Sequence, residues 1–312
     1  MDPYEFLNIS QNPDGSLNRP ILPISPPTDG EESATDSSVL SKDVPLNQAH
    51  NTWLRLFLPK SHPAGKLPII LYVHGGGFIL VSAASSGVHD SCFLRAANIP
   101  TLIVSLEYRL APEHRLPAAY DDAVDALLWL RDQAQSIDTG TSDPWLRDHA
   151  DFSRCFIMGT SAGGNIAYNL ALRSLDLHVE PLRIAGLILS QPYFGGVERT
   201  ESEARSVDNR TLPLAVIDVM WELSLPTGAD RDHEYCNPLP TIAKAKGLPR
   251  CLVKGFVGDP LLDRMREFAK ALEREGVSVA TLMEDEGFHG IEFFSPEKAA
   301  AMVAEFKSFI YY

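Results

Sequence analysis

Two motifs in this sequence carry groups that could act together on a carbonyl carbon. Gly159-Thr160-Ser161-Ala162-Gly163 matches the G-x-S-x-G pattern, in which a sharp strand-to-helix turn exposes a serine hydroxyl. Glycines flanking such a turn relieve its crowding because they have no side chain. His74-Gly75-Gly76-Gly77 can present successive backbone N–H groups to a negatively charged oxygen, and the N–H of Ala162 is a further expected donor. The two motifs predict a serine nucleophile beside an oxyanion-binding loop. The alternatives are an ordinary serine N-cap and a flexible glycine loop.

The base that serves such a serine follows it in the chain, after an acid. Of the nine histidines, only His178, His233 and His289 come after Ser161. His178 lies in a charged loop and His233 in a polar, proline-interrupted region. His289 directly follows the last expected strand, so its loop reaches the same sheet edge as Ser161. We therefore expect His289 to be the base.

The acid is expected at the end of an earlier strand. Asp259 follows an apolar run that ends at Val257, which places it at the same edge. Asp263 is the alternative, but it lies one turn into a helix, where an acidic residue is already explained by the helix dipole. With Asp259 holding its tautomer, His289 can take the proton of Ser161 as the hydroxyl attacks an ester. This chemistry needs no cofactor and no metal.

The elements that position these residues are indicated by apolar runs alternating with helical periodicity. Each run is short enough for a strand buried on both faces. The expected strands are Trp53–Leu58, Leu67–Val73, Thr101–Leu106, Cys155–Met158, Ile184–Leu189, Cys251–Val257 and Val277–Leu282. Helices are expected from Pro117, through Ile166 and Leu170, up to Leu272, and from Ser295-Pro296. This order predicts a single α/β domain over residues 1–312, with a mostly parallel sheet covered by helices on both faces.

Two regions do not fit the alternation of strands and helices. Residues 1–50 read as irregular and polar, and residues 196–240 are broken by prolines, with one helical piece from Leu214 to Leu223. Ligands of open α/β sheets bind at the carboxyl ends of the strands. Both regions are therefore candidates for a cap over that edge.

Composition excludes several classes of partner. The chain has 27 Lys and Arg against 41 Asp and Glu, a formal net charge of −14. Such a surface repels nucleic acid and anionic lipid. No apolar stretch reaches the roughly 18 residues of a membrane span. The first residues do not resemble a signal peptide, and the four cysteines lack metal-site spacing, so we expect a cytoplasmic protein. The oligomeric state cannot be read from the sequence.

Four groups of residues resemble one known family. They are His74–Phe78, Tyr108–Glu113, Gly159–Gly164, and Asp259–Asp263 with Gly287-Phe288-His289. The chain is similar to plant carboxylesterases of the hormone-sensitive-lipase-like branch of the α/β hydrolases. The resemblance covers nearly the whole chain and includes the opening Asp2-Pro3-Tyr4. It implies the α/β-hydrolase fold and a serine carboxylesterase that hydrolyses esters of small lipophilic or specialised metabolites.

The resemblance also implies roles for residues. Ser161, Asp259 and His289 are the implied triad, with Gly76, Gly77 and Ala162 as oxyanion donors. Residues 1–50 and 197–235 are the implied cap, and Gly75 and Phe78 are expected to contact substrate. Arg109 and Glu113 are expected to form a buried structural pair. Ala111-Pro112 or Leu116-Pro117 is expected to be cis, since such bonds gather at tight turns.

Relatives of this family leave two other functions open. Some use the same pocket to dehydrate or cyclise a plant metabolite, and gibberellin receptors bind a hormone without catalysis. The receptors lack the catalytic histidine, whereas His289 is present here. An acyl-enzyme on Ser161 would distinguish hydrolysis from elimination.

Overall fold

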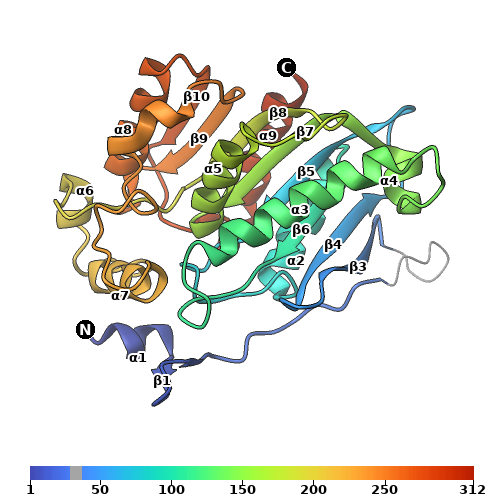
Figure 1. The fold of residues 1–312 in the computed structure, drawn as a ribbon. Helices are drawn as coiled ribbons and strands as arrows, with labels where there is room; N and C mark the ends of the chain where they lie inside the picture. Colours follow the sequence, from blue (N-terminus) through green and yellow to red (C-terminus); the bar gives the residue numbers. More distant parts are fainter. Residues whose placement is uncertain (29–36) are drawn as a thin grey trace.

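The computed structural model describes residues 1–28 and 37–312 (Figure 1). Its centre is an eight-stranded sheet within the described residues, with strand order β10-β9-β8-β7-β5-β6-β4-β3. The strands are β3 (Val39–Asn47), β4 (Thr52–Pro59), β5 (Leu67–Val73), β6 (Leu102–Glu107), β7 (Ala150–Thr160), β8 (Ile184–Ser190), β9 (Cys251–Phe256) and β10 (Val279–Glu284). Strands β5 to β10 pair in parallel, whereas β3 and β4 run antiparallel at one edge. The predicted α/β class and mostly parallel sheet are confirmed.

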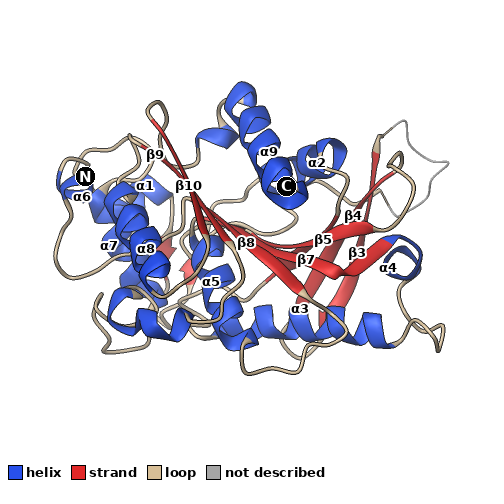
Figure 2. Cartoon of the chain, turned by 90° about the horizontal axis from the view of Figure 1, so that it is seen from above, coloured by secondary structure: helices blue, strands red, loops and turns tan. Residues whose placement is uncertain are grey.

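Helices cover both faces of this sheet (Figure 2). The helices are α1 (Pro3–Leu7), α2 (Ser86–Asn98), α3 (Ala118–Gln135), α4 (Pro144–His149), α5 (Ala162–Ser174), α6 (Glu201–Ala204), α7 (Leu214–Ser224), α8 (Leu262–Arg274) and α9 (Pro296–Tyr311), with 3-10 turns η1 (Leu239–Ala245) and η2 (Ile291–Phe293). Helices α3, α5 and α8 pack on one face, and α2 and α9 on the other. None of the helices in the described part of the chain combines the length and the apolar character that crossing a membrane requires.

Strand β5 explains why the central strands read as continuous apolar runs. Its Ile69 and Leu71 belong to the core under α3 and α5, while Ile70 and Tyr72 belong to the core under α2 and α9. All four are fully buried. A strand with a helical layer on each face must be apolar at every position, which is the pattern that predicted it.

The N-terminal region is more ordered than predicted. Residues Val39–Asn47 form β3, which pairs with β4 and so belongs to the sheet. This strand was not predicted because its side chains alternate in exposure and it contains Pro45, so it does not form a continuous apolar run. The predicted cap over 1–50 is therefore too long, and its residues 29–36 lie outside the described residues.

Residues 1–28, called here the N-terminal arm, are held along the body by side-chain and backbone contacts. Arg19 pairs with Glu113 and donates Nε–H to the carbonyl of Ile79 at 2.6 Å and Nη2–H to that of Ala111 at 2.7 Å. Further along, Pro23 accepts a hydrogen bond from the N–H of Ser86 at 2.8 Å. Helix α1 lies beside α7. The arm thus reaches the region of residues 197–235 from across the sequence.

The ion pairs of the Tyr108–Glu113 segment correct one expectation. Arg109 does not pair with Glu113; it binds Asp122 of α3, with Nη2 2.7 Å from Oδ1. Asp122 is fully buried, so its charge requires this partner. Glu113 instead pairs with Arg19 of the arm. The prediction of a cis proline in this region is confirmed, since both Ala111-Pro112 and Leu116-Pro117 are cis.

Replacing Arg19 by Met should release the N-terminal arm. The substitution removes the ion pair and both backbone contacts while keeping most of the apolar stem. We expect limited proteolysis to cut residues 10–25 faster in Arg19→Met than in the parent. The matched control is Arg205→Met, which removes an exposed pair with Glu201 on α6. Equal cleavage of the arm in both variants would show that Arg19 does not hold it.

Candidate active site

Ser161 sits at a turn that only glycine neighbours allow. It joins β7 to α5 with φ 56° and ψ −123°, a conformation that is strained for a residue with a side chain. A Cβ on Gly159 would lie 2.0 Å from the carbonyl oxygen of Gly163, and one on Gly163 would lie 2.1 Å from that of Val73. Neither distance can be tolerated, so both glycines are required. The turn has the geometry expected of a nucleophile elbow.

The end of β8 holds this turn in place. The N–H of Ser161 donates to the carbonyl of Ser190 at 2.9 Å, and the N–H of Tyr193 donates to the carbonyl of Ser161 at 3.0 Å. Both backbone groups of the strained residue are therefore paired. Because main-chain bonds hold the turn, the Ser161 hydroxyl is left free for other partners.

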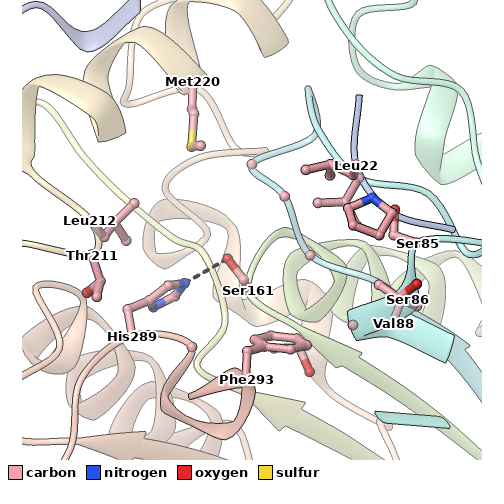
Figure 3. A pocket seen from close by; sticks show the side chains of 18 residues that line it. Leu22, Ser85, Ser86, Val88, Ser161, Thr211, Leu212, Met220, His289 and Phe293 are labelled. Atoms are coloured by element: carbon pink, nitrogen blue, oxygen red, sulfur yellow. Dashed lines mark hydrogen bonds between the residues drawn. The ribbon is translucent and has the colours of Figure 1, made fainter. Parts of the chain in front are cut away.

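Three side chains from distant parts of the sequence meet at this turn. His289 Nε2 lies 2.9 Å from Ser161 Oγ (Figure 3). His289 Nδ1 lies 2.8 Å from Asp259 Oδ2. The other carboxylate oxygen of Asp259 accepts the N–H of Leu261 at 2.9 Å. These contacts form an unbroken chain from a buried carboxylate through an imidazole to a hydroxyl. With Nδ1 donating to Asp259, Nε2 is left as the acceptor that can take the serine proton.

The environment of His289 pulls its pKa in two directions. Burial alone would lower the pKa, because it penalises the charged imidazolium, but the charge of Asp259 and its hydrogen bond raise it, and Glu292 adds to the rise. The net effect is a pKa above the ordinary value of 6.5. Asp259 therefore stabilises the imidazolium that forms when His289 accepts a proton.

The loop His74-Gly75-Gly76-Gly77 runs alongside Ser161. Gly76 and Gly77 have φ values of 103° and 60°. The backbone N–H groups of Gly76, Gly77 and Ala162 donate no hydrogen bond within the described part of the chain. Polar N–H groups left without a partner beside a nucleophile are suited to a developing negative charge.

His74 and Tyr108 fix this loop from behind. Tyr108 Oη donates to the carbonyls of His74 and Gly75, at 3.1 and 3.2 Å. The two rings stack with centroids 4.3 Å apart. Burial lowers the pKa of His74 to about 4, so its imidazole is neutral at physiological pH. This agrees with a structural role for His74. The role of Tyr108 in holding the loop was not predicted, because its place in the Tyr108–Glu113 motif does not reveal what its side chain contacts.

A cavity of about 380 Å³ opens above Ser161 and His289 (Figure 3). Its wall combines residues from the elbow, the glycine loop, the N-terminal arm and the region 197–235. They are Leu22, Pro23, Gly75, Gly76, Gly77, Val81, Ser85, Ser86, Gly87, Val88, Thr160, Ser161, Thr211, Leu212, Met220, His289, Gly290 and Phe293. Among these lining residues of the described chain, His289 is the only one with an acidic or basic side chain. The cavity therefore suits an uncharged, largely apolar ligand.

The structure separates the predicted site residues into two groups. Gly75, Gly76, Gly77, Ser161 and His289 all line the cavity. Phe78 does not: it is 1% exposed and packs against Trp221 and Tyr193, with ring centroids 5.3 and 6.0 Å away. The expectation that Phe78 contacts substrate is therefore corrected, because its ring points into the core beneath α7. Gly75 was distinguished only by its place in the glycine loop, and Phe78 only by its place directly after that loop.

The residues weighed as alternatives lie elsewhere. Asp263 accepts the N–H of Ser202 at 2.8 Å and so joins α8 to α6. His233 accepts the N–H of Tyr235 at 3.2 Å, and the two rings pack together. Leu22, Thr211, Leu212, Met220 and Phe293 were not predicted as wall residues, since single residues scattered over loops, α7 and η2 carry no distinguishing pattern.

One cluster of side chains in the described residues has the composition of a metal site. His50, Asp122 and Asp125 bring possible ligand atoms within 4.8 Å of one another. Arg109 already binds Asp122, and Asn47 donates to Asp125 at 3.0 Å. The carboxylates are thus engaged by a guanidinium and an amide, which account for the cluster without an ion.

Comparison with known proteins adds sequence and structural relatives. The family model described as "alpha/beta hydrolase fold" matches residues 70–293. A protein of Arabidopsis thaliana named "Probable carboxylesterase 8" is 49% identical over 317 residues, which covers 99% of this chain and 93% of that protein. A 3-O-acetylpapaveroxine carboxylesterase of Papaver somniferum is 48% identical over 320 residues, covering 99% and 97%.

A solved structure resembles the whole arrangement. The esterase of Pyrobaculum calidifontis superposes with a TM-score of 0.72 at 26% identity, over 87% of this chain and 85% of that one. The likeness extends beyond the matched central region, since it covers most of both chains. The sequence and structure comparisons therefore agree on the α/β-hydrolase fold.

The titration of His289 should show whether Asp259 and Glu292 raise its pKa more than burial lowers it. Following its imidazole by NMR, we expect a midpoint above 6.5 in the parent protein. Asp259→Asn removes the negative charge but keeps the shape of the side chain. Burial then dominates, and because it lowers the pKa of His289, the midpoint should move to lower pH. An unchanged His289 midpoint in Asp259→Asn would contradict the assigned contact.

Proposed function

Since the chain belongs to the family of proteins with the alpha/beta hydrolase fold and is a carboxylesterase, we propose that Ser161, His289 and Asp259 are its catalytic triad. The observation that carries this proposal is the continuous contact from Asp259 through His289 to Ser161, at 2.8 and 2.9 Å. Asp259 accepts the hydrogen bond from the Nδ1–H of His289, which leaves Nε2 able to accept the proton of Ser161. Dehydration or cyclisation and hormone reception are not favoured, because the relatives at 48–49% identity are named carboxylesterases.

The proposed reaction proceeds in two halves. His289 Nε2 takes the proton of Ser161 Oγ as that oxygen attacks the ester carbonyl carbon, and the carbonyl oxygen becomes negative. The N–H groups of Gly76, Gly77 and Ala162 stabilise this charge. His289 then gives the proton to the leaving alkoxide, and an alcohol departs from the acyl-enzyme. Water repeats the sequence, releasing the acid and restoring Ser161.

We propose a cap made of the N-terminal arm and residues 197–235. Leu22 and Pro23 come from the arm, whereas Leu212 and Met220 come from residues 197–235, and all four line the cavity. Helix α1 also lies beside α7, which joins the two segments. Such a cap shields the acyl-enzyme from bulk water and shapes the acyl and alcohol subsites.

The substrate class follows from the cavity wall. We propose uncharged esters with small acyl groups; the Papaver somniferum relative is named for an acetylated compound. A wall without cationic or anionic groups other than His289 leaves a charged substrate without a partner. A metal or cofactor has no part in the proposed steps.

We also propose that the protein acts in the cytoplasm without nucleic-acid or membrane partners. Its four cysteines are buried and free, as is usual in a reducing compartment. Its formal charge of −14 repels polyanions.

Ser161→Ala should abolish turnover while leaving the fold intact. Loss of the nucleophile is expected to lower kcat by about 10⁶-fold, since the triad acts as a unit. Hydrolysis of p-nitrophenyl acetate gives the rate, and mass spectrometry after treatment with an organophosphate gives the labelled residue. Ser153→Ala, on β7 but at an exposed position, is the matched control. Substantial ester turnover or organophosphate labelling in Ser161→Ala would refute the assignment.

Charge on the acyl group should be selected against. We expect kcat/KM for p-nitrophenyl hemisuccinate to be at least about 100-fold below that for p-nitrophenyl butyrate, because the carboxylate enters without a partner. Leu22→Arg places a cation at the cavity wall and should narrow this ratio. Ile21→Arg adds the same charge at the neighbouring residue, which is fully exposed and outside the wall, and should not. Equal rates for the two esters in the parent would contradict the proposed substrate class.

A further inference from the structure

A buried glutamine connects the nucleophile elbow to the loop that carries His289. Gln191 follows the last residue of β8, is fully buried and has φ 48°. Its own N–H donates to the carbonyl of Lys254 on β9 at 2.7 Å. The preceding residue, Ser190, accepts the N–H of Ser161. Gln191 is therefore fixed to the same strand end that holds the strained serine.

The side-chain amide of Gln191 makes two contacts across to the histidine loop. Its Oε1 accepts the N–H of Gly290, directly after His289, at 2.7 Å. Its Nε2 donates to Glu292 Oε2 at 2.9 Å. Only one orientation of an amide can satisfy an N–H and a carboxylate together, so the side chain is held in a single state. The second oxygen of Glu292 is buried and has no hydrogen-bond partner among residues 1–28 and 37–312, so within them Nε2 of Gln191 is the contact that anchors this carboxylate.

We propose that Gln191 and Glu292 form a positioning pair that holds residues 287–292 against the end of β8 and so aims the imidazole of His289 at Ser161. The inference rests on the proposed triad. Neither residue touches the reacting atoms, so both act through His289. Asp259 controls the imidazole from its Nδ1 side, whereas this pair controls the backbone next to it. Orientation matters because small displacements of a base sharply reduce proton transfer.

The charge of Glu292 gives the pair a second effect. Two carboxylates act on His289, Asp259 from the loop after β9 and Glu292 from η2, and both raise its pKa. The phenol of Tyr72 on β5 also interacts electrostatically with Glu292, and burial raises the pKa of this phenol, so it stays neutral. Lys254 turns its ammonium away, to Glu284 and Glu305. Removing the charge of Glu292 should therefore lower the pKa of His289.

Gln191→Leu tests the positioning role. Leucine has a similar size but makes neither contact, so we expect kcat to fall about 10- to 100-fold with KM nearly unchanged. The matched control is Gln135→Leu, which removes an amide contact of 2.9 Å to the carbonyl of Glu180 at the surface. Circular dichroism and melting temperature establish folding. A kcat for Gln191→Leu equal to that of Gln135→Leu would overturn the proposal.

Glu292→Gln tests the charge, which a purely structural contact would not report. The amide can still accept from Gln191, so kcat near neutral pH should stay above that of Gln191→Leu. The acidic limb of kcat/KM, and the NMR midpoint of His289, should both move to lower pH. Should Gln191→Leu fail to fold, Gln191→Met replaces it, with the same expected loss of kcat. Unmoved midpoints in Glu292→Gln would overturn the pair's effect on His289, whereas a parent without ester turnover would overturn the triad itself.

Discussion

A backbone contact too close for any side chain underlies this site. The turn at Ser161 exists because Gly163 packs directly on the carbonyl of Val73, at the end of the neighbouring strand. That contact brings the elbow against the glycine loop that continues from Val73. The proposed oxyanion donors and the proposed nucleophile are therefore adjacent as a direct result of strand pairing. Strain at Ser161 is accepted because main-chain bonds from β8 hold both of its backbone groups.

The same strand ends organise the rest of the machinery. Asp259 follows β9, and His289 lies in the loop after β10, so the parallel sheet brings together residues far apart in sequence. The end of β8 supplies Ser190 and Gln191, which connect the serine to the histidine loop. The proposed catalytic groups lie just after the ends of sheet strands, while the cavity above them is built from less regular segments. This division lets the chemistry stay constant as the pocket varies.

Sequence reasoning reached the groups whose chemistry dictates their spacing. The glycine pattern around Ser161 and the apolar runs of buried strands such as β5 follow from sterics and burial, so they are legible in the chain itself. Strand β3 was missed because an edge strand needs only one apolar face. The Arg109–Glu113 pairing was wrong because ion pairs depend on which elements meet, and Arg19 arrives from a distant segment. Gln191 carried no signal, since its importance lies in two contacts that only the folded loops create.

The neutral wall of the cavity has a consequence for the direction of the reaction. An ester enters as an uncharged molecule, but hydrolysis converts its acyl half into a carboxylate at neutral pH. Apart from a protonated His289, the cavity wall offers this carboxylate no cationic side chain. The protein around it carries a formal charge of −14. The neutral wall and the acidic protein around it thus favour release of the carboxylate product, which leaves the site free for the next ester.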